Sequence, residues 1–295
     1  MTRLTAQDFD PEVLQLFDRH VHGDLSRRGF LEQATRVAGS PAAAAGLLAA
    51  LSPQFAAAQV VPPGDPRITT RQQAFDSPQA SGKVRGLLAK PAKATGRLPV
   101  VLVVHENRGL NPHIEDIARR LAVDGYLAYA PDALATLGGY PGDEDKAREL
   151  FGKLDADKTR ADFVAAARAL LTLPEGNGKV GVVGFCFGGG MANYLATQVA
   201  ELAAAVPFYG EQPPAAEVPK IKAPLLIHYA SDDERINAGW PAYDVALKAA
   251  HLRYEAHIYP GTQHGFNNDT TPRFDKAAAQ LAWGRTMAFF KANLA

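Results

Sequence analysis

The chain has almost no cysteine to cross-link it and no surplus of basic residues to attract polyanions. It contains one cysteine among 295 residues, and its 31 lysine and arginine residues equal its 31 aspartate and glutamate residues. One cysteine excludes an intramolecular disulfide and any metal site made of several cysteines. A net charge of zero gives no basic surplus, so neither nucleic acid nor an anionic membrane surface is expected as a partner. The sequence also shows no internal repeat.

The single cysteine lies in the most informative motif of the chain. Cys186 is the centre of Gly-Phe-Cys-Phe-Gly at 184–188, with a strand-like run at 179–183 before it and a helix-like run at 189–196 after it. This order predicts a nucleophile elbow, the tight strand-to-helix turn that presents the nucleophile of α/β-hydrolases. The glycines permit the sharp turn and a close approach of helix and strand. The positive end of the new helix favours a thiolate at Cys186.

A nucleophile of this kind needs a base and an acid, and both follow in the expected order. Asp233 comes after an apolar strand-like run at 225–229, and His264 comes after another at 254–259. The order nucleophile, acid, histidine is that of α/β-hydrolases. Each residue follows the carboxyl end of a strand, where open α/β sheets carry their sites. The histidine would move the protons, and the aspartate would hold its ring in the useful tautomer.

Neighbouring residues of the same types leave alternatives for each role. Taken alone, a cysteine after an apolar strand is more often a buried apolar residue than a nucleophile. Asp232 is the rival of Asp233, and we expect it to be a loop or capping residue. Other histidines are expected to be structural or to lie on helix surfaces: His113, His228, His251 and His257. His105, His228 and His264 show no metal-ligand spacing, so we predict no metal. We also expect no cofactor.

Four sequence blocks together resemble the dienelactone hydrolase (carboxymethylenebutenolidase) family, over roughly residues 70–295. They are the cysteine block at 184–189, a His-Glu-Asn-Arg-Gly-Leu block at 105–110, the acid block at 233–237 and the His-Gly-Phe block at 264–266. The resemblance implies an α/β-hydrolase fold with a mostly parallel central sheet of about eight strands and helices on both faces. It also implies hydrolysis of a small-molecule ester or lactone through a thioester acyl-enzyme, with a Cys-His-Asp triad.

The resemblance further assigns roles to residues beside the triad. Glu106 would help to control the ionisation of Cys186, because a nearby carboxylate disfavours a second negative charge until substrate binds. The backbone N–H groups of Asn107 and Phe187 would form the oxyanion hole. His105 is expected to be structural or to line the pocket.

The residues that bind substrate are less well defined. The type enzyme of the family grips the carboxylate of its substrate with arginines, but Asn, Asn and Asp occupy 267–269 after the histidine block. Arg108 and Arg273 are candidates to replace those arginines. Three aromatic residues are candidates for the pocket wall, with packing as the alternative: Tyr140, Tyr209 and Trp240. The hydrolase class is therefore better supported than a dienelactone substrate.

The remainder of the chain after residue 70 alternates between strand-like and helix-like segments. The expected strands are 71–75, 83–89, 98–104, 127–130, 180–183, 203–208, 225–229 and 254–259. The expected helices are 112–124, 143–154, 158–173, 188–199, 239–250 and 273–292. Such alternation predicts a mostly parallel sheet with helices on both faces. The resemblance adds an antiparallel pair formed by the first two strands.

Residues 1–58 have the layout of a twin-arginine (Tat) export signal. Ser-Arg-Arg-Gly-Phe-Leu at 26–31 precedes an alanine-rich apolar run at 37–51, and Ala-Ala-Ala at 56–58 offers a cleavage site. The apolar run is too short for a stable membrane anchor. The prediction is a signal at 1–58, a linker at 59–70 and one hydrolase domain at 71–295, exported by the Tat machinery to the periplasm or beyond. The alternative is an amphipathic N-terminal helix with a chance arginine pair.

Two further functions are open on the sequence alone. One is a broad carboxylesterase or thioesterase with no physiological lactone. The other is a non-catalytic redox sensor on the same fold, with Cys186 as an exposed thiol. A sensor has no need of Asp233 or His264, so the sequence favours the hydrolase. The protein is expected to act as a monomer or small homo-oligomer.

Overall fold

Eight strands form one sheet in the computed structural model, which describes residues 4–295. The strand order is β1-β2-β4-β3-β5-β6-β7-β8. The bounds are β1 Ile68–Ser77, β2 Gly82–Pro91, β3 Leu98–Val104, β4 Leu127–Pro131, β5 Gly176–Phe185, β6 Ala204–Phe208, β7 Leu225–Asp232 and β8 Tyr254–Gln263. β2 pairs antiparallel with both β1 and β4, and all other neighbours are parallel. The expected mostly parallel sheet with an antiparallel first pair is therefore confirmed.

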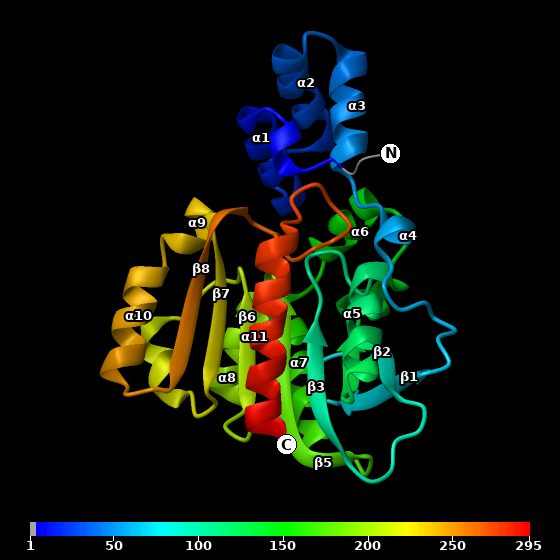
Figure 1. The fold of residues 1–295 in the computed structure, drawn as a ribbon, viewed down its shortest axis with the longest axis vertical. Coiled ribbons are helices and arrows are strands. Elements are labelled where there is room, and N and C mark those ends of the chain that lie inside the picture. The colour runs from blue at the N-terminus through cyan, green and yellow to red at the C-terminus, as the bar shows by residue number, and fades with distance from the viewer. Residues whose placement is uncertain (1–3) are drawn as a thin grey trace.

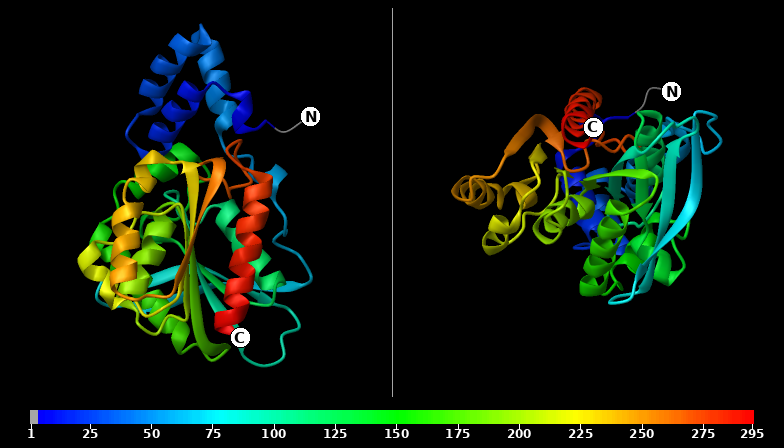
Figure 2. Two further views of the ribbon diagram at one scale, coloured as in Figure 1. Left: turned by 60° about the vertical axis from the view of Figure 1, so that its left-hand side comes forward. Right: turned by 90° about the horizontal axis from the view of Figure 1, so that it is seen from below.

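Helices cover both faces of this sheet (Figures 1 and 2). The α-helices after residue 70 are α5 Pro112–Val123, α6 Glu144–Phe151, α7 Ala156–Leu171, α8 Phe187–Gln198, α9 Glu234–Asn237, α10 Trp240–Ala249 and α11 Lys276–Leu294. Short 3-10 helices are η1 Ala6–Asp8, η2 Ala133–Leu137 and η3 Ala215–Lys220. α5 and α11 pack into one core, and α7, α8 and α10 pack into the other.

Strand β3 shows how the sequence separates the two cores. Successive side chains of a strand point to opposite faces of the sheet. Val100, Leu102 and Val104 accordingly join the core under α7 and α8, whereas Val101 and Val103 join the core under α5 and α11. All five are fully buried, as expected of a central parallel strand. The apolar run at 98–104 therefore fixes β3 in the middle of the sheet.

Residues 6–58 contain a compact helical unit rather than an extended segment. Its helices are α1 Pro11–His22, α2 Arg27–Ala38 and α3 Pro41–Leu51, with the short α4 Phe55–Ala58 after them. The side chains of Asp10, Ser26 and Ser40 cap the first three helices by accepting backbone N–H groups. A small core of apolar side chains, among them Phe17 and Phe30, is buried between the three helices. We call residues 6–51 the N-terminal helical unit.

The N-terminal helical unit lies over the carboxyl ends of the parallel strands (Figure 1). Arg27 pairs with Asp145 at 2.7 Å, and Asp18 pairs with Arg273 at 3.0 Å. The segment 41–58 is also long and apolar enough to cross a membrane, and a signal sequence or a core helix meets the same criterion. The export signal thus stays a prediction, while the described residues form a folded cover above the sheet.

The segment that follows, expected to be a linker, is held against the body by side chains of α5. The carboxylate of Asp116 accepts the backbone N–H groups of Val60 and Val61, at 3.0 and 2.8 Å. Arg119 donates its Nε to the Val61 carbonyl at 2.7 Å. β1 then starts at Ile68, three residues before the expected strand, because its pairing with β2 extends to Pro91. Residues 60 and 61 are therefore tied to α5 by hydrogen bonds.

Candidate active site

Cys186 occupies the expected sharp turn between β5 and α8. Its φ angle is +55°, a region that a residue with a side chain seldom adopts, and its N–H donates to the Phe208 carbonyl at 3.1 Å. A Cβ at Gly188 would collide with the backbone carbonyls of Val104 and His105. Glycine is therefore needed here because α8 passes directly against β3. Such strain at a nucleophile is the mark of an elbow, which holds the sulfur above the sheet.

His264 and Asp233 are brought together as the chain order predicted. Nδ1 of His264 donates to Oδ2 of Asp233 at 2.6 Å, and both side chains are buried. Asp233 also caps α9 by accepting the N–H of Ile236 at 3.4 Å. The bond to the carboxylate fixes the proton on Nδ1, so that Nε2 points to the cysteine side. Nε2 of His264 lies within 4.8 Å of the Cys186 sulfur.

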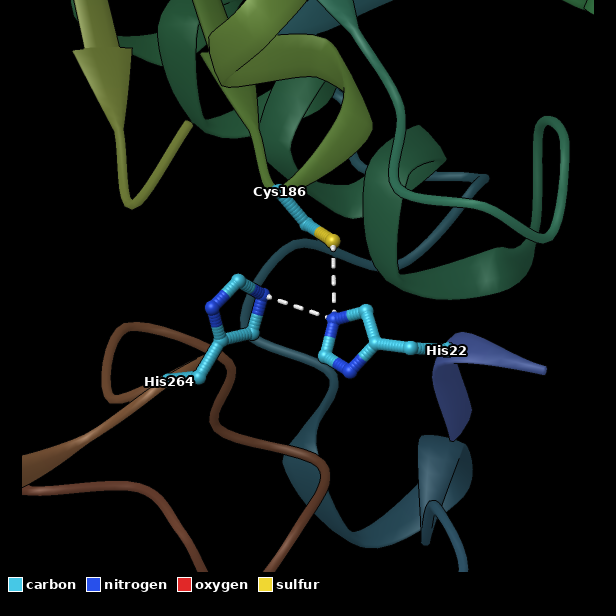
Figure 3. Close-up of side chains that lie close together, drawn as sticks. All are labelled: His22, Cys186 and His264. Atoms are coloured by element: carbon cyan, nitrogen blue, oxygen red, sulfur yellow. Dashed lines mark hydrogen bonds between the residues drawn. The ribbon is translucent and has the colours of Figure 1, made fainter. Parts of the chain in front are cut away.

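A second histidine, which no sequence motif indicated, lies beside these two groups and within reach of both (Figure 3). Nε2 of His22 is 3.6 Å from the Cys186 sulfur and 3.3 Å from Nε2 of His264. Nδ1 of His22 bonds to the Asp18 carbonyl at 2.8 Å and lies 3.3 Å from the Asp18 carboxylate. His22 is the last residue of α1, so the N-terminal helical unit contributes a side chain directly to the site.

One signal in the sequence was available for finding His22. The segment 10–23 has an Asp-Pro start, a strongly amphipathic pattern and a terminal glycine, which together predict a short helix. In the structure this helix is α1, and its C-cap at Gly23 leaves His22 in the last turn. The pattern shows a helix, but it gives no indication of which distant residues His22 meets.

The charges of the three groups support one another. Burial raises the pKa of Cys186, but the charge of His264 and hydrogen bonds from His22 and His264 outweigh burial and lower the pKa to about 6. Burial lowers the pKa of His264, but the Cys186 thiolate and the bond to Asp233 outweigh it and raise the pKa to about 10. At neutral pH the pair therefore favours a thiolate beside an imidazolium.

The loop after β3 places Glu106, Asn107 and Arg108 at the same edge of the sheet. Oε2 of Glu106 accepts the side-chain N–H of Asn268 at 2.9 Å. The side chains of Asn107 and Arg108 both donate to the backbone carbonyl of Val21, at 2.8 and 3.2 Å. Two of the three residues thus hold the end of α1 in place. Their expected roles in ionisation, oxyanion binding and substrate binding remain predictions.

The other candidates lie at various distances from the sulfur. Phe187 is the first residue of α8, where backbone N–H groups lack intrahelical acceptors, as an oxyanion donor requires. Tyr209 is buried with its ring 5.0 Å from that of His264. Tyr140 donates its hydroxyl to Glu144 at 2.9 Å. Trp240 packs on Tyr229, with ring centres 5.4 Å apart.

Three of the other histidine and aspartate residues considered for the site make structural hydrogen bonds. His228 is buried between the hydroxyls of Tyr259 and Thr286, at 2.9 and 3.1 Å. The Nε2 of His105 accepts the N–H of Ala133 at 3.1 Å. Asp232 is exposed at the end of β7 and accepts the hydroxyl of Ser231 at 2.7 Å.

Two cavities meet at the cysteine, and His22, Cys186 and His264 line both. One, of about 370 Å³, lies beneath the N-terminal helical unit and is lined by polar and charged residues, including Glu106, Arg108 and Arg273. The other, of about 640 Å³, lies over α8 and has aromatic walls that include Phe187 and Tyr194. Tyr140 lines the first cavity and Tyr209 the second.

Comparisons with known proteins match the two parts of the chain separately. The dienelactone hydrolase family profile matches residues 84–294, and a YqhI-like profile matches residues 1–39. A Saccharolobus solfataricus protein named "Putative carboxymethylenebutenolidase" is 32% identical over 253 residues, which cover 74% of this chain and 96% of the relative. An Escherichia coli protein named as a hydrolase fragment, YghX, is 54% identical over 105 residues, covering 36% of this chain and 90% of the relative.

A solved structure agrees with these sequence matches. The dienelactone hydrolase structure from Klebsiella pneumoniae superposes with a TM-score of 0.65 at 28% identity, and covers 76% of this chain and 99% of its own. A Pseudomonas putida esterase with 18% identity and a TM-score of 0.63 shares the fold. The neighbours therefore have the α/β-hydrolase type of fold expected from the elbow motif.

Proposed function

The chain belongs to the dienelactone hydrolase family, and we propose that it hydrolyses its ester or lactone with Cys186 as nucleophile. The family and its carboxymethylenebutenolidase relatives make the protein an ester or lactone hydrolase. One observation carries the finer proposal. The sulfur of Cys186 sits on a strained elbow within 4.8 Å of a His264 ring whose other nitrogen is bonded to Asp233.

In the proposed reaction the Cys186 thiolate attacks the carbonyl carbon of the substrate. The negative charge that develops on the carbonyl oxygen would be stabilised by the backbone N–H groups of Asn107 and Phe187. His264 then gives its Nε2 proton to the leaving alkoxide, and a thioester on Cys186 remains. A water molecule, deprotonated by His264, attacks the thioester and releases the carboxylic acid and the thiolate.

The cavity over α8 is the better candidate for the acyl part of the substrate. Its walls carry Phe187, Met191 and Tyr194, and Arg235 lies at its edge toward His22. Arg108 and Arg273, the candidates for a carboxylate grip, are instead engaged by Val21 and Asp18 of the N-terminal helical unit. In the full-length chain, this arrangement favours an ester or lactone with an apolar acyl group.

A screen of p-nitrophenyl esters and lactones tests the proposal, with two variants of the nucleophile. Cys186→Ala should abolish turnover and keep the fold, whereas Cys186→Ser should retain little activity because a serine hydroxyl has a much higher pKa than a thiol. Iodoacetamide should inactivate the wild type. Turnover that survives complete alkylation would show that the cysteine is not the nucleophile, and no turnover with any ester would favour a sensor.

Export by the Tat machinery is a separate part of the proposal. Its support is the Arg27-Arg28 motif followed by the alanine-rich run, with small residues at 56–58. The expected mature protein would begin near Gln59 and lack the N-terminal helical unit. The full-length chain, in which His22 reaches the sulfur, would then be the form present before cleavage.

A further inference from the structure

We propose that His22, Cys186 and His264 together bind one divalent transition-metal ion, of which Zn²⁺ is the best match. The ligand atoms of these three residues all lie within 4.8 Å of one another (Figure 3). They come from α1, from the elbow and from the turn after β8, at 22, 186 and 264 in the chain. No short sequence spacing could have indicated such a site, which explains why the sequence analysis expected no metal.

Two of the three distances between the ligand atoms match those around a tetrahedral ion. Zinc bonds to histidine nitrogen at about 2.0–2.1 Å and to cysteine sulfur at about 2.3 Å. Tetrahedral angles then place two nitrogens about 3.3 Å apart, and nitrogen and sulfur about 3.6 Å apart. The observed separations are 3.3 Å between the two Nε2 atoms and 3.6 Å between the sulfur and the Nε2 of His22. The third separation, between the sulfur and the Nε2 of His264, is within 4.8 Å, so an ion would bridge the three atoms once the sulfur and this nitrogen approach to about 3.6 Å.

The groups behind the ligands also suit a metal. Histidine ligands usually donate their other ring nitrogen to a carboxylate or a backbone carbonyl, which orients the ring. His264 does so to the Asp233 carboxylate at 2.6 Å, and His22 does so to the Asp18 carbonyl at 2.8 Å. Both Nε2 atoms are thereby turned to the sulfur. Three protein ligands leave a fourth position open to the two cavities, where a water molecule completes the coordination.

One group competes with the ion. Nη2 of Arg235 lies 2.9 Å from the Nε2 of His22, beside the ring nitrogen that a metal would use. Arg235 is partly exposed, and its Nη1 lies 3.7 Å from Glu211, so it has an alternative partner outside the site. Binding of the ion would displace this arginine and release the Nε2 proton of His264 to solvent. Arg235 thus limits the affinity without being a ligand.

The bound ion would have two consequences for the protein. The sulfur lone pair that attacks a carbonyl carbon would be held by the metal, so the loaded enzyme would not acylate. The ion would also join α1 to the elbow and to the turn after β8, which ties the N-terminal helical unit to the hydrolase domain. The site is therefore an inhibitory one, and it exists only while residue 22 remains attached.

Cobalt titration of the full-length, EDTA-treated protein tests the proposal directly. One equivalent of Co²⁺ should give a thiolate-to-cobalt charge-transfer band and the strong visible bands of tetrahedral cobalt, and Zn²⁺ should displace it. His22→Ala should weaken binding by about 100-fold or more, since loss of even an outer partner costs about 10–100-fold. Arg235→Gln should strengthen it. His251→Asn, at an exposed histidine with a φ of +53°, is the matched control and should change nothing.

The outcomes separate this proposal from the proposed hydrolysis. Absence of the charge-transfer band at stoichiometric cobalt would overturn the metal site, as would an unchanged band in His22→Ala that keeps the wild-type circular dichroism. Zinc should also abolish ester turnover and raise the unfolding temperature of the wild type but not of His22→Ala. A metal-free enzyme that turns over through Cys186 but binds no cobalt refutes only the metal. A protein that binds cobalt but never hydrolyses an ester refutes only the nucleophile.

Discussion

The sulfur of Cys186 has two imidazole neighbours, His264 and His22, and each imidazole is hydrogen-bonded to a different aspartate residue. His264 is bonded to a buried carboxylate, so its charge is stabilised where the thiolate needs it. His22 is held by Asp18 on α1, and it adds a hydrogen bond to the sulfur from outside the family's catalytic residues. The ionisation of Cys186 is therefore expected to depend on a residue of the N-terminal helical unit.

Alkylation of the metal-free protein measures that dependence. The pKa of Cys186 is lowered from 9.0 to about 6, so the rate of reaction with iodoacetamide should rise as the pH increases through about 6 and level off above it. A group that lowers the pKa moves the midpoint up when it is removed. His22→Ala should therefore shift the midpoint to higher pH, and the His251→Asn control should not. An unshifted midpoint in His22→Ala would mean that this ring does not reach the sulfur in solution.

Glu106 allows a second test at this scale. We predict that its carboxylate controls when the sulfur is charged, so Glu106→Gln should change the pH profiles of alkylation and of kcat/KM. Asn268→Ala is the matched control, because it removes the partner that donates to Glu106 at 2.9 Å and keeps the carboxylate. If Glu106→Gln leaves both profiles in place and alters only KM, Glu106 binds substrate or packs, and the switching hypothesis is wrong.

At the scale of single elements, the contact between α8 and β3 fixes where the nucleophile stands. Gly188 faces the backbone of Val104 and His105 with no room for a Cβ, whereas a Cβ at Gly190 would find its nearest neighbour, the Glu211 nitrogen, at 3.5 Å. The two glycines are two residues apart in the first turns of α8. One is required by packing and the other is not.

A pair of alanine substitutions tests this difference. Gly188→Ala should lower the free energy of unfolding by about 3 kcal/mol, because α8 must move away from β3. Gly190→Ala should keep stability or raise it by up to about 1 kcal/mol, since alanine is the better helix former. Urea unfolding followed by circular dichroism gives both values. Equal effects of the two substitutions would contradict the close approach seen at Gly188.

The central strands around the candidate site were the most predictable part of the chain. Apolar runs at 98–104, 180–183 and 225–229 lie within the observed β3, β5 and β7, because central parallel strands need continuous apolar sequence. Ends were less predictable. β8 continues to Gln263 with an irregular pattern of exposure and β1 starts at Ile68, because edge and outer strands carry many polar residues and depend on pairing rather than on pattern.

At the scale of the whole molecule, the helical cover over the sheet was the part that local pattern could not place. Before residue 52 the sequence shows capped, amphipathic segments and a twin-arginine motif. An export signal and a folded helical segment both fit these features. Only the tertiary contacts join Asp18 to Arg273 and His22 to Cys186. Such contacts leave no periodicity in the sequence. The sequence alone therefore could not predict that His22 lies at the Cys186 sulfur.

The twin arginines permit a clean test of export. Arg27 pairs with Asp145 and Arg28 with Glu32, and lysine at both positions keeps the charge of these exposed pairs. Arg27→Lys with Arg28→Lys should therefore fold normally and leave precursor in the cytoplasm. Cell fractionation and N-terminal sequencing give the answer. Asp145→Asn, which breaks one pair and keeps both arginines, is the control and should be exported. Unprocessed protein in the periplasm, or export without the Tat translocon, would contradict the prediction.

The position of the site's residues along the chain has a consequence for synthesis. His22 is made first, Cys186 164 residues later, and His264 a further 78 residues after that. During translation the thiol therefore exists for a time with neither the imidazole of His264 nor the carboxylate of Asp233 to activate it. On the proposed mechanism, a nascent chain that does not yet include His264 can neither cleave an ester nor present its most reactive thiolate, so the hazard of a reactive sulfur begins only after His264 has been made.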